Sequence, residues 1–205
     1  MQRFVLLSLA ASLSALTPVM AQSLELRAHQ HSSGPVTAGI GDTVQIDVVA
    51  RLDCLGVSGI DLHLSLPTSA FEVIDHSPEY AGIQPFSKGS LFDNVVTAYN
   101  GISDVPEVVA EDRTHFRYAA LAGLGDSRVL KGDGLVASFE VVVQGTLNHA
   151  EVRIEDTPIL ETRLVLPDGT TERRFVSLNG IDVSTGLFLT AIEEGSWAQV
   201  KGAVD

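Results

Sequence analysis

The stretch from Gly39 to Leu66 constrains the fold more than any other part of the chain. In its first half apolar and polar residues alternate from Thr43 to Val48, and in its second half they alternate again from Gly59 to Leu66. Such alternation predicts β-strands, because successive side chains of a strand point to opposite faces. Each strand then has one apolar face that a second layer must cover. The stretch therefore predicts two strands of a sheet that packs on another sheet.

The rest of the chain continues in the same way, with short alternating segments separated by Gly, Pro, Asn and Asp. Further strands are expected at 24–27, 71–75, 95–99, 113–121, 135–143, 151–155, 163–166, 172–178 and 181–183. The dipeptide Asn100-Gly101 is predicted to be a turn that closes the strand before it. No long helical period interrupts the series. The pattern indicates an all-β fold, a two-sheet antiparallel β-sandwich with jelly-roll topology.

Residues 1–21 have the features of a secretory signal peptide. Arg3 precedes a short apolar run, and Val19 and Ala21 are small residues where a signal peptidase would cleave. The expected organisation is a signal peptide at 1–21, one sandwich domain at 22–185 and a short C-terminal tail at 186–205. The protein is expected to be secreted (periplasmic, cell-surface or extracellular), and no later run is apolar enough to span a bilayer.

The charge balance bears on the class of partner. Loss of Arg3 with the signal peptide leaves 12 basic and 26 acidic residues, a net charge of −14. This composition argues against nucleic acid as the partner, because phosphate binding requires concentrated Lys and Arg. Cys54 is the single cysteine, so no internal disulfide is expected. We interpret it as a small buried apolar residue rather than a nucleophile.

Several segments together resemble the cohesin domain family. They are Gly41-Asp42-Thr43-Val44, the run from Gly56 to Leu64, the segment 86–94 (FSKGSLFDN) and the segment 132–143 (GDGLVASFEVVV). The resemblance spans roughly 24–183. It implies a cohesin-like sandwich that acts as a non-catalytic module for protein–protein attachment at or outside the cell envelope, with a dockerin-like partner. Cohesins are similar in fold to several carbohydrate-binding modules, so polysaccharide binding is the alternative.

One trio of residues invites comparison with a hydrolase. Asp61, His63 and Ser65 alternate along a single strand and share one face, which we expect to be exposed to solvent. A Ser–His–Asp triad requires a hydrogen-bonded chain with an oxyanion hole, whereas these side chains would stand side by side about 7 Å apart. We therefore interpret the trio as a polar sheet surface, and no enzyme activity is expected.

That surface is the expected binding face for a protein partner. Asp61, His63 and Ser65 would contribute to it from one strand, and His115 and Arg117 from another. Binding of a polysaccharide would instead use exposed aromatic rings, for which Tyr80 and Tyr99 are the candidates because they lie in or near loops.

Metal binding has weak candidates only. His29 and His31 form a His-x-His pair without an evident third ligand. Calcium prefers several oxygen ligands, which Asp126 and Asp133 of a glycine-rich loop could supply. A second acidic group comprises Asp104, Glu107, Glu111 and Asp112. Neither group has EF-hand spacing, so no cofactor is expected and calcium is kept as an alternative.

Overall fold

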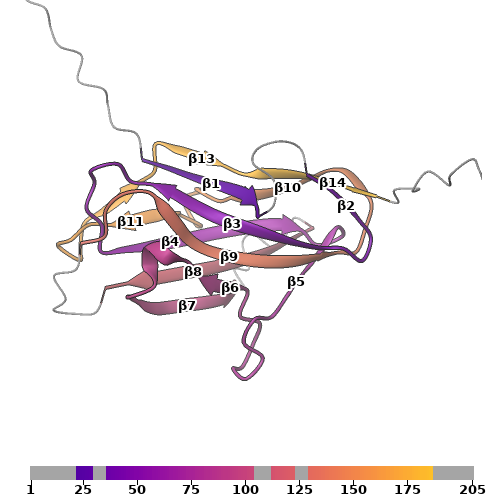
Figure 1. Ribbon diagram of the computed structural model, residues 1–205, viewed down its shortest axis with the longest axis horizontal. Helices are drawn as coiled ribbons and strands as arrows, with labels where there is room; N and C mark the ends of the chain where they lie inside the picture. The colour runs from indigo at the N-terminus through magenta and orange to yellow at the C-terminus, as the bar shows by residue number, and fades with distance from the viewer. Residues whose placement is uncertain (1–21, 30–35, 104–111, 123–128, 187–205) are drawn as a thin grey trace, which may run out of the picture.

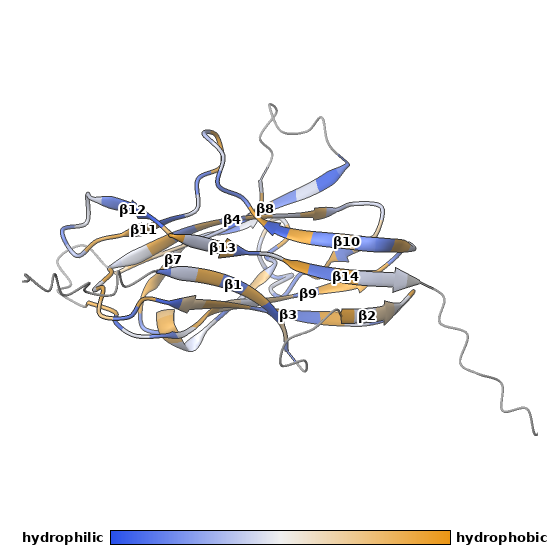
Figure 2. Ribbon diagram, turned by 90° about the horizontal axis from the view of Figure 1, so that it is seen from above, coloured by the Kyte–Doolittle hydropathy of each residue, from blue (hydrophilic) through white to orange (hydrophobic). Residues whose placement is uncertain are grey.

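The computed structural model describes residues 22–29, 36–103, 112–122 and 129–186. Strands account for most of these residues, and they form two sheets that face each other (Figures 1 and 2). In Figure 2, β4, β8 and β11 lie in the upper layer and β1, β3 and β9 in the lower one.

The first sheet has six strands, with β9 pairing both β5 and β6 at one side. Its members, in spatial order, are β13 (Ser177–Asn179), β1 (Ser23–Ala28), β3 (Thr43–Arg51), β9 (Gly134–Val143), β5 (Phe71–Val73) and β6 (Phe86–Lys88). The pairing of β1 with β13 is parallel, and the other pairings in this sheet are antiparallel.

The second sheet has eight strands. Six of them follow one another in the order β12 (Glu172–Arg174), β11 (Arg163–Val165), β4 (Gly59–Pro67), β10 (Leu147–Ile154), β14 (Ile181–Gly186) and β2 (Val36–Gly39). In addition, β8 (Arg113–Leu121) pairs with β4, and β7 (Val96–Ile102) pairs with β8. Here β14 and β2 form the second parallel pair. A short 3-10 turn, η1 (Ser90–Phe92), follows β6, and none of the helices described is long and apolar enough to cross a membrane.

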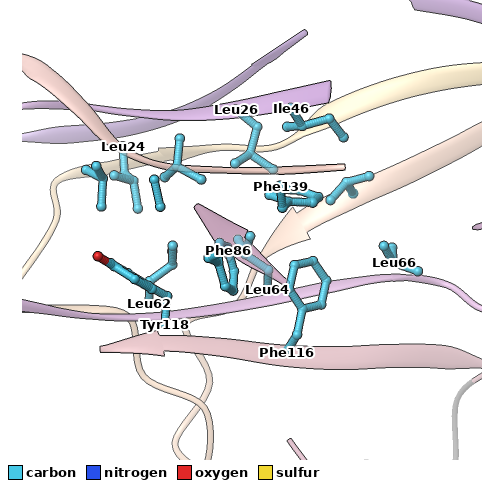
Figure 3. Packing of buried hydrophobic residues seen from close by; sticks show 14 of the residues in the cluster. Leu24, Leu26, Ile46, Leu62, Leu64, Leu66, Phe86, Phe116, Tyr118 and Phe139 are labelled. Atoms are coloured by element: carbon cyan, nitrogen blue, oxygen red, sulfur yellow. The ribbon is translucent and has the colours of Figure 1, made fainter. Parts of the chain in front are cut away.

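The two-sheet, all-β prediction is thus confirmed, and the core lies where the alternation placed it. Ile46 and Val48 of β3 and Leu62 and Leu64 of β4 are fully buried between the sheets. Four aromatic rings meet at the centre, from Phe86, Phe116, Tyr118 and Phe139, and Figure 3 shows them between the strands of the two layers.

The predicted turn at Asn100-Gly101 is wrong, because both residues lie inside β7. The side chain of Asn100 accepts a hydrogen bond from the backbone N–H of Phe86 at 3.0 Å and donates one to its carbonyl at 2.8 Å. The Asn100 side chain of β7 therefore replaces a neighbouring strand as the hydrogen-bond partner of Phe86 in β6, and it links the two sheets at this side. This contact joins residues 14 apart, so the local dipeptide pattern could not reveal it.

We predict that Asn100→Ala lowers the free energy of unfolding by about 1–3 kcal/mol, because it leaves two backbone groups of the buried residue Phe86 unpaired. The measurement is urea denaturation followed by circular dichroism. Asn94→Ala is the matched control, since Asn94 is exposed and a surface change of this kind shifts stability by only about 0.5 kcal/mol. Equal midpoints for the two variants would contradict the role assigned to Asn100.

Cys54 is exposed, so its interpretation as a buried apolar residue is also wrong. The preceding residue, Asp53, has a φ of 50° in the left-handed region. This turn follows buried Leu52 and carries the next side chain away from the core.

Candidate functional site

The outer face of the second sheet carries a line of apolar positions across four neighbouring strands. Gly59 of β4 is opposite Leu121 of β8 on one side and Val165 of β11 on the other, and Leu121 is opposite Val96 of β7. We call these four positions the apolar row. Val96 is 61% exposed, whereas Leu121 and Val165 are half-buried. Gly59 itself is buried, so solvent reaches the row at Val96 and in part at Leu121 and Val165. The row spans about 15 Å, the width of three strand spacings.

Gly59 keeps this row flat. A Cβ atom placed on Gly59 would lie 2.6 Å from the carbonyl oxygen of Ala120 and 2.7 Å from Leu121 Cδ1. Any side chain at this position would displace Leu121 and separate β4 from β8.

A second line of residues runs beside the first, two positions along β4, β8 and β11 and three along β7, where the register shifts at a bulge. It consists of Tyr99, Ala119, Asp61, Arg163 and Arg174, and we call it the charged row. Arg163 pairs with Glu161 and, at 2.6 Å, with Glu172, and Arg174 pairs with Glu161 at 2.6 Å. The acidic partners hold the two arginines of β11 and β12 in place at the edge of the surface.

Arg117 of β8 joins Tyr99 and Asp61 of the charged row. Its Nε and Nη2 atoms donate to the two carboxylate oxygens of Asp61, each at 2.7 Å. Its Cζ lies 5.3 Å from the centre of the Tyr99 ring, and the Tyr99 hydroxyl donates to the carbonyl of Ile102 at 2.9 Å. Tyr99 and Arg117 are each about two-fifths exposed, and these contacts hold both side chains in place.

The pKa of Asp61 lies below its ordinary range. Burial would raise it, but hydrogen bonds from His63 and from Arg117 favour the carboxylate and prevail. The nearest contact with His63 is 3.4 Å, between Nε2 and Oδ1. Asp61 is thus ionised, and its carboxylate forms an ion pair with the guanidinium of Arg117.

We predict that Asp61 titrates below its ordinary value of 3.8. A carboxyl group whose pKa is lowered by folding stabilises the protein above its unfolded-state pKa, and this contribution is lost as the pH falls through the folded-state pKa. NMR titration of the Asp61 carboxyl carbon measures the value directly. The midpoint should rise in Arg117→Ala, and an unchanged midpoint would contradict the pairing.

The expectation that His63, Ser65 and His115 face solvent is wrong. Their exposed fractions are 9%, 0% and 7%. Ser65 accepts a hydrogen bond from Arg113 Nε at 2.9 Å, and its hydroxyl donates to the carboxylate of Glu155. These two side chains cover it.

A hairpin is inserted between β10 and β11, which both pair with the same side of β4. Residues 156–161 form it, with Asp156 bridged to Glu161. Its two ends are tied to His63, since the N–H of Glu155 donates to the His63 carbonyl at 2.8 Å and the N–H of His63 donates to Thr162 Oγ1 at 3.0 Å. The hairpin adjoins β4 at the boundary between a covered half of the predicted face, with His63 and Ser65, and an exposed half, which begins at Asp61.

Only part of the predicted binding set is brought together at the exposed half. Arg117 contacts both Asp61 and Tyr99 there. Tyr80 is 66% exposed but lies in the loop between β5 and β6, two strands of the other sheet. The structure thus separates the two tyrosines into different surroundings.

The metal candidates gain no support among the residues described. Asp126, His31, Asp104, Glu107 and Glu111 lie outside them. His29 Nδ1 is 2.9 Å from Asp47 Oδ2, and Asp133 Oδ1 accepts the N–H of Leu52 at 3.1 Å. No group of three or more His, Cys, Asp or Glu side chains suited to a metal occurs in the described ranges.

Sequence reasoning missed the apolar row and the inserted hairpin. The row combines single residues from separate strands, so it depends on a register that the sequence does not reveal. The hairpin could have been predicted from Asp156-Thr157-Pro158, a turn-forming sequence within an otherwise alternating segment.

No model of a protein family matches the sequence, and no curated protein sequence matches it either. Solved structures do match. A non-cellulosomal cohesin from Archaeoglobus fulgidus aligns at 16% identity and a TM-score of 0.53, over 87% of this chain and 97% of the other. A type II cohesin domain from the cellulosome of Acetivibrio cellulolyticus aligns at 16% identity and a TM-score of 0.59, over 80% and 95%.

A third match is the cohesin in a type I cohesin–dockerin complex from Clostridium thermocellum, at 14% identity and a TM-score of 0.51, over 80% of this chain and 99% of the other. At these identities the likeness concerns the backbone arrangement. The chain has the cohesin-like β-sandwich fold.

Proposed function

We propose that this protein is an exported, non-catalytic recognition module that binds another protein through the exposed half of the β7, β8, β4, β11 and β12 surface. The observation that carries the proposal is the apolar row lying directly beside Tyr99, Arg117 and Asp61. Protein interfaces combine an apolar centre with a polar rim and are enriched in Tyr and Arg. Side chains held in place before binding also lose less conformational freedom when the partner docks.

The comparisons support the choice of a protein partner. Among the solved structures of this fold are cohesins in complex with dockerins, from Acetivibrio cellulolyticus and Clostridium thermocellum. By analogy we propose a dockerin-like protein as the partner. The features of a signal peptide at residues 1–21 support attachment in the periplasm, at the cell surface or outside the cell.

The geometry around Ser65 supports a non-catalytic role. Its hydroxyl is fully buried and bonded to Glu155, and Asp61, His63 and Ser65 follow one another along one strand. A nucleophile must instead be reachable by substrate and hydrogen-bonded to its base.

Two exposed valines allow a matched test. Val96 is in the apolar row and is 61% exposed, while Val176, which follows Phe175 outside both rows, is 62% exposed. The wild-type protein and the variants Val96→Asp and Val176→Asp are used as baits with the secreted proteins of the source organism. A partner should be retained by wild type and Val176→Asp and lost with Val96→Asp. Equal retention by both variants would overturn the proposed surface.

The alternative of polysaccharide binding rests on the high exposure of Tyr80. Its test is retention on insoluble polysaccharides. Saccharide retention that is lost with Tyr80→Ala or Tyr99→Ala would replace the protein-binding proposal. If the wild-type protein is retained on none of the polysaccharides, protein recognition stays the proposed function.

A further inference from the structure

The inserted hairpin at 156–161 is extra to the sheet. β10 ends opposite Leu64 of β4, and β11 begins opposite Asp61. Two positions of β4 lie between these pairs, so a continuous strand would need two residues there, whereas the chain has eight, 155–162. The six surplus residues leave the sheet, and Figure 2 shows the chain between β10 and β11 rising above the upper layer, away from the first sheet.

The tip of the hairpin is a tight turn. The N–H of Thr157 donates to the carbonyl of Leu160 at 2.9 Å, and the N–H of Leu160 donates to Thr157 Oγ1 at 3.1 Å. Pro158 between them has a restricted φ. Leu160 is 1% exposed, whereas Ile159 is 54% exposed. The turn thus buries one apolar side chain and presents the other to solvent.

The base of the hairpin is joined to the charged row by ion pairs. Glu161 pairs with Arg174 at 2.6 Å and also with Arg163. Across the base, Asp156 Oδ2 is 3.9 Å from Arg174 Nη1. Arg163 is opposite Asp61, a member of the proposed binding surface. The hairpin therefore stands directly beside that surface, on the side of the charged row.

We propose that the inserted hairpin selects the partner, with Ile159 as its contact residue, an inference that rests on the proposed function. The partner it fits is a protein with an apolar recess beside the area that covers the apolar row. A protein without that recess would be held off by the hairpin, and its contacts with the apolar row would be lost. Steric exclusion of this kind is a general means of rejecting wrong partners.

The exposure of Ile159 has this meaning because of its position. Single exposed apolar residues are common on protein surfaces. Turns, however, favour Gly, Pro, Asn, Asp and Ser, and this isoleucine lies at the tip of a raised hairpin beside the proposed binding surface. Its transfer into an apolar recess is favourable. The hydrogen bonds at the tip and the ion pairs at the base limit the conformational freedom that binding would remove.

The first test is calorimetric titration with the partner protein isolated on the wild-type bait. Ile159→Asp should weaken binding about tenfold or more, because the burial of an isoleucine side chain is lost. Ile40→Asp is the matched control and should keep the wild-type dissociation constant. Ile40 is 47% exposed and lies between β2 and β3, at the far end of the second sheet.

A wild-type dissociation constant for Ile159→Asp would overturn the role of the hairpin. Loss of the same partner in Val96→Asp would then leave the proposed function standing, since Val96 belongs to the apolar row. If the wild-type bait retains no partner, both proposals are overturned.

Deletion of 156–161 tests selection. It joins Glu155 to Thr162, which both already bond to the backbone of His63, so that β10 and β11 can continue as one strand. Circular dichroism and thermal unfolding show whether the variant folds. Among the secreted proteins of the source organism, the folded variant should retain proteins that the wild type rejects. A retained set identical to that of the wild type would overturn selection by the hairpin, and if the deletion prevents folding, the titration of Ile159→Asp decides the proposal.

Discussion

Alanine in place of Phe139 is expected to lower the free energy of unfolding by about 3–5 kcal/mol, the cost of removing a large buried ring whose site cannot fully collapse. Phe139 is fully buried, and its ring centre lies 5.6 Å from that of Phe86 and 5.1 Å from that of Phe116. Figure 3 shows the three rings between the sheets. These rings come from β9, β6 and β8, so their contacts connect the two layers.

Guanidinium denaturation measures the effect as a lower midpoint with an unchanged m-value. Phe139→Leu is the control, because it keeps most of the buried volume and should lose clearly less than the alanine variant. A loss below about 1 kcal/mol in Phe139→Ala would mean that the cluster contributes little, since large-to-small changes in a packed core cost more than this.

The sequence was sufficient for the long strands because each has one buried face. The run 113–121 was predicted as a strand and is β8 with the same limits, and the alternation in 43–48 and 59–66 marks β3 and β4. The buried side chains of β8, Phe116 and Tyr118, obey the same two-residue period. This period is a local property, so it could be read without any knowledge of neighbouring strands.

The candidate site depended on contacts that are distant along the chain. His63 was expected on the surface, but it is buried, and its backbone bonds to Glu155 and Thr162 on either side of the hairpin at 156–161. Asn100 was expected in a turn, and it pairs instead with the backbone of Phe86. Arg117 and Asp61 were correctly placed on one face. Their direct pairing could not be predicted, because it depends on the register between β4 and β8.

That pairing gives the largest expected effect on recognition. In the proposed complex, Arg117→Ala should weaken binding by about 2 kcal/mol or more, which is roughly 30-fold in the dissociation constant. The variant removes the guanidinium beside Tyr99 and leaves the carboxylate of Asp61 without its bidentate partner. Arg117→Lys should recover only part of the loss, because an ammonium group cannot donate to both carboxylate oxygens in the same planar arrangement.

Arg27 provides the matched control for this measurement. It is 39% exposed against 38% for Arg117, and it also pairs with a carboxylate, Glu25, at 2.7 Å, but it lies on β1 of the other sheet. Calorimetric titration of the partner should therefore give a wild-type dissociation constant for Arg27→Ala. Equal weakening by Arg27→Ala and Arg117→Ala would assign the effect to net charge, since loss of either arginine makes this acidic protein more negative. A large difference between them would assign recognition to the exposed half of the second sheet, where the apolar row and the Tyr99–Arg117–Asp61 group meet.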